Sequence, residues 1–258
     1  MAPRPAATVV LVRDRADGPE VLLLRRTRSS GFVPGAWVFP GGRVDAGDAV
    51  PDLLARLDGL DGAEAARRLG LEPEGTPGPA AVAYYLAALR EAFEETGILV
   101  GHRAGEPVPP AQVDPDVEAL RNALLGDELD FAGVLGHLDA RLDGGRVAYL
   151  AHWITPIQEP RRYDTRFFLA EVHAEAESVV DPREMTEARW LRPAAALELN
   201  RAGHLPMVFP TIHTLETLAP FASAADAHAA LDRREIPTIL PRLVRTPTGV
   251  GLRLPQEE

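Results

Sequence analysis

The stretch that most constrains the fold lies between Pro79 and Gly97, which predict the start and the stop of a helix over about residues 80–96. Apolar residues recur along one side of it at a helical period, namely Val82, Leu86, Leu89 and Phe93. Three carboxylates are expected on the opposite side, namely Glu91, Glu94 and Glu95. The pattern therefore predicts a helix that packs against a core on one side and is acidic on the other.

Crowded glutamates of this kind permit two interpretations. An acidic helix face is commonly a solvated surface. Here, however, the carboxylates lie three and four residues apart near the negative end of the helix dipole, so they repel one another. Arg90 precedes Glu94 by four residues, which is the less favourable order for an ion pair. A hard divalent cation such as Mg²⁺, which prefers oxygen ligands, would relieve this repulsion.

Composition excludes several other chemistries. The 258 residues include no cysteine and no lysine, which rules out disulfides, thiolate catalysis, Schiff bases and a Walker-type phosphate loop. A net charge of −11 argues against broad binding to nucleic acid or to anionic membranes. The apolar runs are too short for a membrane span, and no signal-peptide pattern is visible, so a cytoplasmic protein is expected.

Strand patterns occur before and after the helix, which favours the α/β class. The expected strands cover residues 7–13, 20–27, 37–39, 147–154 and 167–173. Further helices are expected at residues 194–201, 212–218 and 224–234. Residues 49–80 contain weakly helical pieces and a Pro/Gly-rich loop at 72–79, and they are interpreted as an insertion.

A resemblance to a known family appears at the acidic helix. The run Arg90-Glu91-Ala92-Phe93-Glu94-Glu95-Thr96-Gly97-Ile98 matches the second half of the Nudix box at every specified position. Gly42 and Asp48, separated by five residues, resemble its first half, in which glutamate is usual in place of Asp48. A long insertion inside the box is a feature of a Nudix subgroup that includes coenzyme A and acyl-coenzyme A diphosphatases.

The resemblance extends beyond the box. Residues 22–27 and 35–42 are similar to the motif that precedes the box in coenzyme A diphosphatases, with departures at Leu24 and Gly31. Residues 190–193 resemble a Trp-x-x-Pro element of many Nudix proteins. Together the matches cover about residues 7–195.

This resemblance implies an α/β Nudix fold, in which a mixed β-sheet is sandwiched between helices. It implies a single domain over residues 1–258, with a helical insertion at about 49–80 and a helical C-terminal extension at about 194–258. The implied activity is Mg²⁺- or Mn²⁺-dependent hydrolysis of a diphosphate bond in a nucleoside diphosphate derivative, with coenzyme A or its acyl esters as leading substrates. ADP-ribose, dinucleotides and nucleotide sugars are alternatives, and so is a nucleotide-sensing module without catalysis.

The resemblance also assigns roles to individual residues. The metal ligands are Glu91, Glu94 and Glu95, and the catalytic residues are Glu94, Glu91 and Arg90, with Arg90 orienting a glutamate. Gly41 and Gly42 allow a tight turn beside the helix. Asp48 is either a further acid of the site or a turn residue. The general base is not assigned, and Glu171, Glu184 and Glu187 are only candidates.

Arginines provide candidate phosphate contacts. Arg26, Arg162 and Arg166 can bind a phosphate by bidentate hydrogen bonds, but solvated or snorkelling side chains explain them as well. The expected partner is therefore a small nucleotide derivative. A homodimer formed through the insertion and the C-terminal helices is also an open alternative, as is a role of these segments as a substrate lid.

Overall fold

The structure is a computed structural model, and it describes residues 2–29, 31, 33–71, 80–231, 234–246 and 249–254. The first half of the described chain contains β1 (Arg4–Arg15), β2 (Gly18–Arg26), β3 (Trp37–Val38), β4 (Gly41–Arg43), the 3-10 helix η1 (Ala46–Ala49), α1 (Pro51–Leu54), β5 (Leu57–Asp58), α2 (Gly62–Leu69), α3 (Ala81–Thr96), β6 (Gly101–Arg103), β7 (Glu106–Pro107), α4 (Pro115–Leu125) and α5 (Phe131–Leu138). The second half contains β8 (Arg141–Asp143), the 3-10 helix η2 (Gly144–Arg146), β9 (Val147–Ile154), β10 (Tyr163–Glu171), β11 (Met185–Leu191), α6 (Pro193–Arg201), α7 (Phe209–Leu218), α8 (Ala224–Leu231), β12 (Thr238–Ile239), β13 (Arg242–Thr246) and β14 (Gly249–Arg253).

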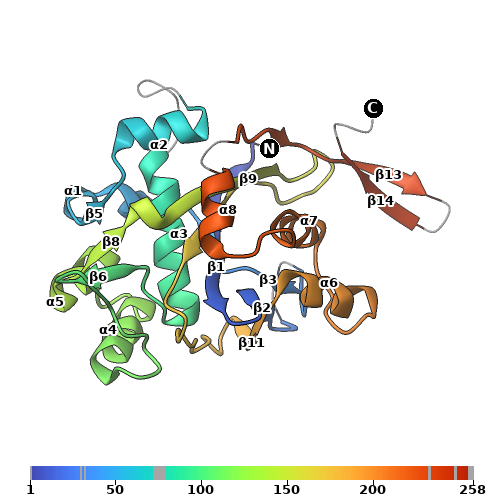
Figure 1. Cartoon of the computed structure of the whole chain (residues 1–258). Coiled ribbons are helices and arrows are strands. Elements are labelled where there is room, and N and C mark those ends of the chain that lie inside the picture. Colours follow the sequence, from blue (N-terminus) through green and yellow to red (C-terminus); the bar gives the residue numbers. More distant parts are fainter. Residues whose placement is uncertain are drawn as a thin grey trace.

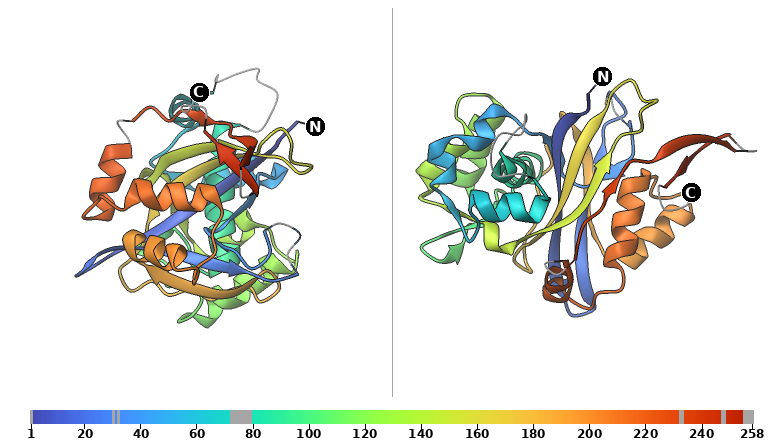
Figure 2. Two further views of the ribbon diagram at one scale, coloured as in Figure 1. Left: turned by 90° about the vertical axis from the view of Figure 1, so that its right-hand side faces the viewer. Right: turned by 90° about the horizontal axis from the view of Figure 1, so that it is seen from above.

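The centre of the fold is a mixed sheet in the strand order β11-β2-β1-β10-β9-β12. Strand β1 runs parallel to β10 and antiparallel to β2, and the short strands β3 and β4 pair with β2 and β1. Seen edge-on in Figure 2, the sheet lies between two groups of helices. The predicted α/β class, with a mixed sheet between helices, is confirmed.

Two hydrophobic cores lie on opposite faces of this sheet, and the period of two along β1 separates them. Val9 and Leu11 face a core that includes α3, while Val10 and Val12 face the core made with α6, α7 and α8. All four side chains are at most 3% exposed. The five strands expected from sequence are present, but β11 was missed because this edge strand lacks the apolar run that marks the others.

Helix α3 corrects one expectation about the acidic face. Its bounds agree with the predicted helix, but it is buried on nearly all sides rather than on one stripe. Ala83, Ala87 and Ala88 are 0% exposed, and even Glu95 is only 5% exposed. The acidic side is therefore not a solvated surface, since the Glu91 carboxylate lies against Gly42 and the Glu95 carboxylate accepts the Gly41 N–H of β4.

The insertion expected at about 49–80 is helical, as predicted, and it also contributes a strand. Its helices α1 and α2 bury Leu53, Ala65 and Leu69 in the core around α3. Strand β5 joins a second small sheet in the order β5-β8-β6-β7. The expected loop at 72–79 lies outside the described residues.

The C-terminal extension is helical only in its first part. Three helices extend to Leu231, but the later described residues form strands, so a helical extension to residue 258 is wrong. Strand β12 lies between Pro237 and Pro241, and proline disfavours helix because it lacks an N–H. It pairs in parallel with β9 at the sheet edge, and the β13–β14 hairpin extends away from the body in Figure 1.

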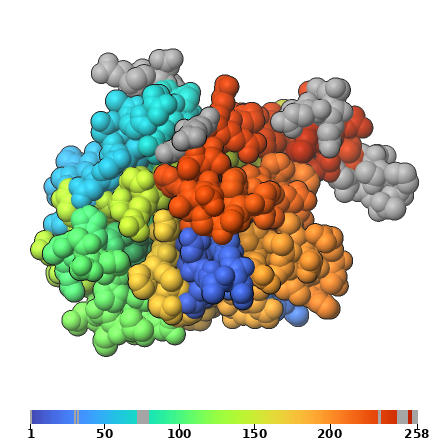
Figure 3. Space-filling model, viewed as in Figure 1, coloured from blue at the N-terminus to red at the C-terminus, as the bar shows by residue number. Residues whose placement is uncertain are grey.

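The C-terminal helices also cover the first strands of the chain. The Asp14 side chain accepts a hydrogen bond from the Ala224 N–H at 2.8 Å, where α8 begins. The space-filling view in Figure 3 accordingly shows α8 over the blue first strands. Of the helices in the described ranges, none has the length and apolarity needed to cross a membrane.

Candidate functional site

The two glycines predicted beside the helix lie where β4 meets α3. The Gly41 N–H donates to Oε2 of Glu95 at 3.0 Å. A Cβ on Gly41 would come within 2.8 Å of the Thr8 Cα, and one on Gly42 would overlap the Glu91 carboxylate. Close pairing of β4 with β1 therefore requires glycine at position 41, and close packing of β4 on α3 requires it at position 42. Together the two glycines form a cradle for the Glu91 and Glu95 carboxylates.

Arg90 is the hub of the site. Its Nε and Nη2 donate to the two oxygens of Asp48 at 2.7 and 3.1 Å. Its Nη1 donates to Glu91 at 2.9 Å and to Glu94 at 3.1 Å. The Arg90 guanidinium thus holds three carboxylates, and this geometry is what an orienting residue requires.

Asp48 makes the local turn contact considered from sequence, and it also binds Arg90. It is 1% exposed, and its Oδ2 accepts the Asp45 N–H at 2.8 Å, which is a local turn contact. The same carboxylate is the bidentate partner of Arg90. The insertion does not displace Asp48 from the helix, because Asp48 lies in η1, which precedes the insertion and binds Arg90 of α3.

Burial dominates the electrostatics of the glutamates. It raises the pKa of Glu91 to about 7, with the Arg90 charge opposing and the Glu94 charge adding to the shift. It likewise raises the pKa of Glu94. The pKa of Glu95 lies well above its ordinary value, because burial and the Glu91 charge outweigh the Gly41 hydrogen bond. One arginine therefore leaves the buried carboxylates short of positive charge.

These residues fit a hard divalent cation by their chemistry. The donors are carboxylate oxygens, and the cradle at Gly42 holds the Glu91 carboxylate so closely that a Cβ would displace it. In the part of the chain that the structure describes, no three acidic or histidine side chains are grouped as a ligand set. In this arrangement the glutamate oxygens have protein partners: Arg90 donates to Glu91 and Glu94, and the Gly41 N–H donates to Glu95.

An open groove of about 560 Å³ adjoins the hub. Arg90, Asp48 and Glu94 line one wall, and residues from the α4–α5 region line the other. The facing wall consists of Leu124, Asp127, Glu128, Leu129, Asp130, Phe131 and Ala132. The groove is large enough for part of a nucleotide derivative, but its acidic lining would repel phosphates without bound cations.

Sequence reasoning missed this facing wall. Its residues lie about 30 positions beyond the box, and no periodic pattern links them to it. A usable signal was present in the helix starts, where Asp114 precedes Pro115 and Asp130 precedes Phe131. Aspartate N-caps at these positions predict helices α4 and α5, although they do not predict where the helices pack.

The three predicted phosphate-binding arginines lie in different places. Arg26 ends β2, and its charge lowers the pKa of Glu95 against the effect of burial, so it lies near the glutamates. Arg162 Nε donates to the Thr155 carbonyl at 3.1 Å in the β9–β10 connection. Arg166 is 5% exposed and donates to the Leu69 carbonyl at 2.8 Å, which ties β10 to the end of α2.

Among the general-base candidates, Glu184 is the one whose charge acts on Glu95, where it raises the pKa further. Glu187 instead pairs with Arg189 at 2.6 Å. The identity of the base stays unassigned, as it was from sequence.

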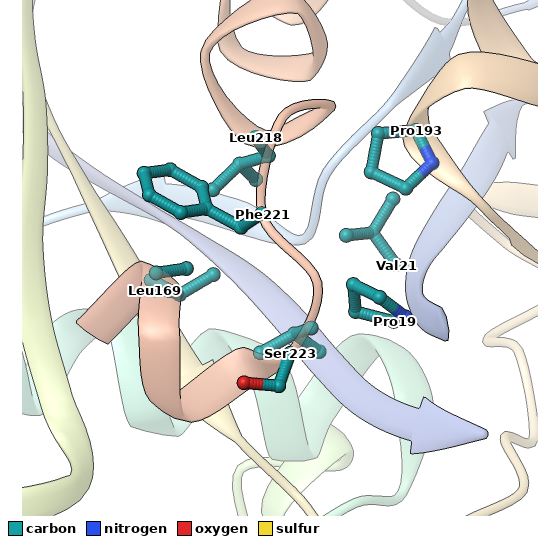
Figure 4. Close-up of a pocket in the computed structure, with 9 residues that line it drawn as sticks. Pro19, Val21, Leu169, Pro193, Leu218, Phe221 and Ser223 are labelled. Carbon is teal, nitrogen blue, oxygen red and sulfur yellow. The ribbon is translucent and has the colours of Figure 1, made fainter. Parts of the chain in front are cut away.

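A second cavity, drawn in Figure 4, lies between the sheet and the α7–α8 region. Its volume is only about 10 Å³, and its lining is mostly apolar, with Leu169, Leu218 and Phe221 around it. A space of this size and character stays dry and has no chemistry of its own. The groove beside Arg90 is therefore the better candidate for a substrate site.

Comparison with known proteins decides the family. A sequence profile of the NUDT19 Nudix domain matches residues 3–218. The chain belongs to the Nudix hydrolase family. The human acyl-coenzyme A diphosphatase NUDT19 is 30% identical over 94% of this chain and 72% of that protein. NUDT19 of Gallus gallus is 31% identical over 81% of this chain and 63% of its own length.

A solved Nudix structure agrees with this assignment. The crystal structure of a Nudix hydrolase from Alicyclobacillus acidocaldarius is 30% identical, with a TM-score of 0.70. The likeness covers 90% of this chain and 97% of that one. The likeness to a solved Nudix structure therefore extends over most of this chain.

Proposed function

We propose that this Nudix protein hydrolyses the diphosphate bond of a nucleoside diphosphate derivative with the help of Mg²⁺ or Mn²⁺. The observation that carries the proposal is the convergence of Asp48, Glu91 and Glu94 on Arg90 beside an open groove. Glu91, Glu94 and Glu95 would hold the cation. When bound, divalent cations supply neutralisation of phosphate charge and an acidified water. The proposal treats residues 1–258 as one domain, since both cores share one sheet.

Residues around the glutamates position them and receive the substrate. Arg90 orients Glu91 and Glu94 through its Nη1, and it is itself fixed by both oxygens of Asp48. Gly42 lets β4 pack closely on Glu91, and the Gly41 N–H binds Glu95, so both glycines hold glutamates in place. The groove receives the substrate beside Glu94, and Arg26 lies near enough to Glu95 to assist with phosphate charge. Arg162 is a further candidate for this task, whereas Arg166 is 5% exposed and donates to the Leu69 carbonyl and the Tyr149 hydroxyl, so a structural role is proposed for it.

Coenzyme A or an acyl-coenzyme A leads the proposed substrates. The support is the similarity to NUDT19 proteins, two of which are named acyl-coenzyme A diphosphatases and are about 30% identical to this chain. ADP-ribose, dinucleotides and nucleotide sugars follow, because the acidic helix acts on the diphosphate while other parts of the groove select the rest. No nucleic acid or membrane partner is proposed.

The test is product analysis by mass spectrometry after incubation with coenzyme A, acetyl-coenzyme A, ADP-ribose, NADH and a nucleotide sugar. Each substrate is supplied with Mg²⁺ or with Mn²⁺, and the Glu94→Gln variant is the control. We expect 3′,5′-ADP and phosphopantetheine from coenzyme A with the wild type. Turnover by Glu94→Gln should fall by more than about 100-fold, because even outer contacts of metal ligands cost about 10–100-fold. Failure to cleave any member of the panel would contradict the proposal.

A nucleotide-sensing module is the second candidate, and it is favoured by Asp48, which stands where glutamate is usual in the Nudix box, and by the insertion inside the box. The same variant separates the two functions. A sensor would bind nucleotide without cleaving it, and Glu94→Gln would keep that affinity. Calorimetric titration of both proteins with coenzyme A therefore complements the product analysis.

A homodimer is proposed as an open alternative for the intact protein. The insertion buries Leu53, Ala65 and Leu69 in the core of its own chain, so its deletion would expose that core. Light scattering on the full chain is the appropriate measurement, and a monomeric mass would exclude the dimer.

A further inference from the structure

The C-terminal end of α3 lies in the interior, although a helix end leaves carbonyl oxygens without partners inside the helix. Three parts of the chain satisfy them. The Gly97 N–H donates to the Phe93 carbonyl at 2.9 Å, and the Val179 N–H donates to the Thr96 carbonyl at 2.8 Å. The third partner is the side chain of Arg121, which comes from α4.

Arg121 binds the turn that carries the glutamates. Its Nε donates to the carbonyls of Phe93 at 3.0 Å and of Glu94 at 2.9 Å, and its Nη2 donates to the Glu94 carbonyl at 2.6 Å. Arg121 is only 3% exposed. Neither of these acceptors is a carboxylate, so the guanidinium binds the backbone beneath Glu94 while the Glu94 side chain lines the groove.

The charge of Arg121 is placed where the acidic helix is least stable. The negative end of the helix dipole disfavours carboxylates in the last turn, and a cation there offsets it. Burial lowers the pKa of Arg121, while the charges of Asp181, Glu118 and Glu94 act in the opposite direction. Gly97 ends the helix beside Arg121 with a φ of +69°, and a Cβ there would come within 2.8 Å of the Ala111 Cβ, so the turn that Arg121 packs against requires glycine.

We propose that Arg121 is a positioning residue of the metal site. It fixes the backbone of Phe93 and Glu94, and its charge lets Glu94 and Glu95 gather at a helix end that would otherwise repel them. This inference rests on the proposed function. It assigns a role in cation binding to a residue outside the Nudix box, whereas Arg90 acts on the side chains of the same glutamates.

The test compares Arg121→Gln and Arg121→Lys with a matched control, Arg56→Gln. Arg56 donates to the carbonyls of Leu135 at 3.4 Å and Ala140 at 3.2 Å at the end of α5. It therefore provides the same backbone contact on a helix without candidate metal ligands. The readout is Mn²⁺ affinity, measured from the free Mn²⁺ signal by electron paramagnetic resonance, with circular dichroism to verify the fold.

We expect Arg121→Gln to weaken Mn²⁺ binding by roughly tenfold, as for other contacts behind metal ligands. Arg121→Lys keeps the charge and should recover part of the affinity, and Arg56→Gln should bind as the wild type does. Wild-type affinity in a folded Arg121→Gln protein would overturn the inference. If that variant does not fold, Arg121→Lys provides the test, because one ammonium cannot replace the Nε and Nη2 donors of the guanidinium. Wild-type Mn²⁺ affinity in Arg121→Lys would then overturn the inference.

The wild type separates this inference from the proposed function. If the wild type binds no Mn²⁺ and cleaves no diphosphate, the proposed function fails, and the role of Arg121 fails with it. If the wild type binds Mn²⁺ and the Arg121 variants match it, only the role of Arg121 fails.

Discussion

Arg90 and Asp48 form a bidentate pair across the whole length of the insertion, with Nε and Nη2 of Arg90 at 2.7 and 3.1 Å from the two Asp48 oxygens. The Asp48 side chain is 1% exposed and that of Arg90 is 12% exposed. The residues before and after the insertion therefore meet at one site, and the insertion does not separate them.

Asp48→Asn should destabilise the protein by about 3–5 kcal/mol, because a buried arginine loses its ionised partner. The measurement is urea unfolding. Asp45→Asn is the control, since Asp45 is exposed and lies 4.0 Å from Arg90, and we expect it to cost about 1 kcal/mol or less. Equal losses in the two variants would show that the pair has no special contribution.

Gly42→Ala should reduce Mn²⁺ affinity and turnover, because a Cβ would overlap the Glu91 carboxylate and force it or the strand to move. We expect a cost of about 1–3 kcal/mol in stability, as for other overpacked sites. Gly47→Ala is the matched control, as nothing lies within 4 Å of a Cβ there. Turnover that is unchanged in Gly42→Ala would contradict the cradle.

The metal-free protein should lose stability as pH rises from about 5 to about 8. Glu91 has an ordinary pKa of 4.5 in the unfolded chain, and burial raises the pKa to about 7 in the folded protein. The folded state thus holds an additional proton in this range, and its stabilising contribution is complete below the unfolded pKa and disappears as pH passes about 7. The loss from this group is on the order of 2 kcal/mol.

Urea unfolding in EDTA checks this pH dependence. Glu91→Gln cannot titrate, so its stability should change less between about pH 5 and about pH 8 than that of the wild type. Parallel curves for the two proteins would contradict the assignment to Glu91. Saturating Mn²⁺ should reverse the wild-type loss, because cation binding favours the ionised carboxylate.

Arg166→Leu should destabilise the protein by roughly 2 kcal/mol, because the Leu69 carbonyl and the Tyr149 hydroxyl lose a charged donor. Thermal unfolding measures the loss. We expect KM and kcat to stay near the wild-type values, since the contacts of Arg166 join β10, β9 and α2. A several-fold rise in KM for coenzyme A would instead support a substrate contact.

Local patterns in the sequence were sufficient for the main elements. Pro79 and Gly97 predicted the bounds of α3, since proline favours a helix start and glycine accepts the left-handed φ of +69° found at Gly97. Short apolar runs predicted β1, β2, β9 and β10, and the nine residues from Arg90 to Ile98 indicated the Nudix family. These features are readable because they depend on neighbours along the chain.

The tertiary structure decided everything that depends on distant segments. The sequence left open whether the glutamates face solvent or a cation, whereas in the structure Glu91 and Glu95 pack against β4, and burial raises the pKa of both. Arg166 is a surface candidate in sequence and an internal tie to Leu69 in the structure. Arg121 carries no local signal at all, because a buried arginine acquires its role only from the carbonyls that packing brings to it.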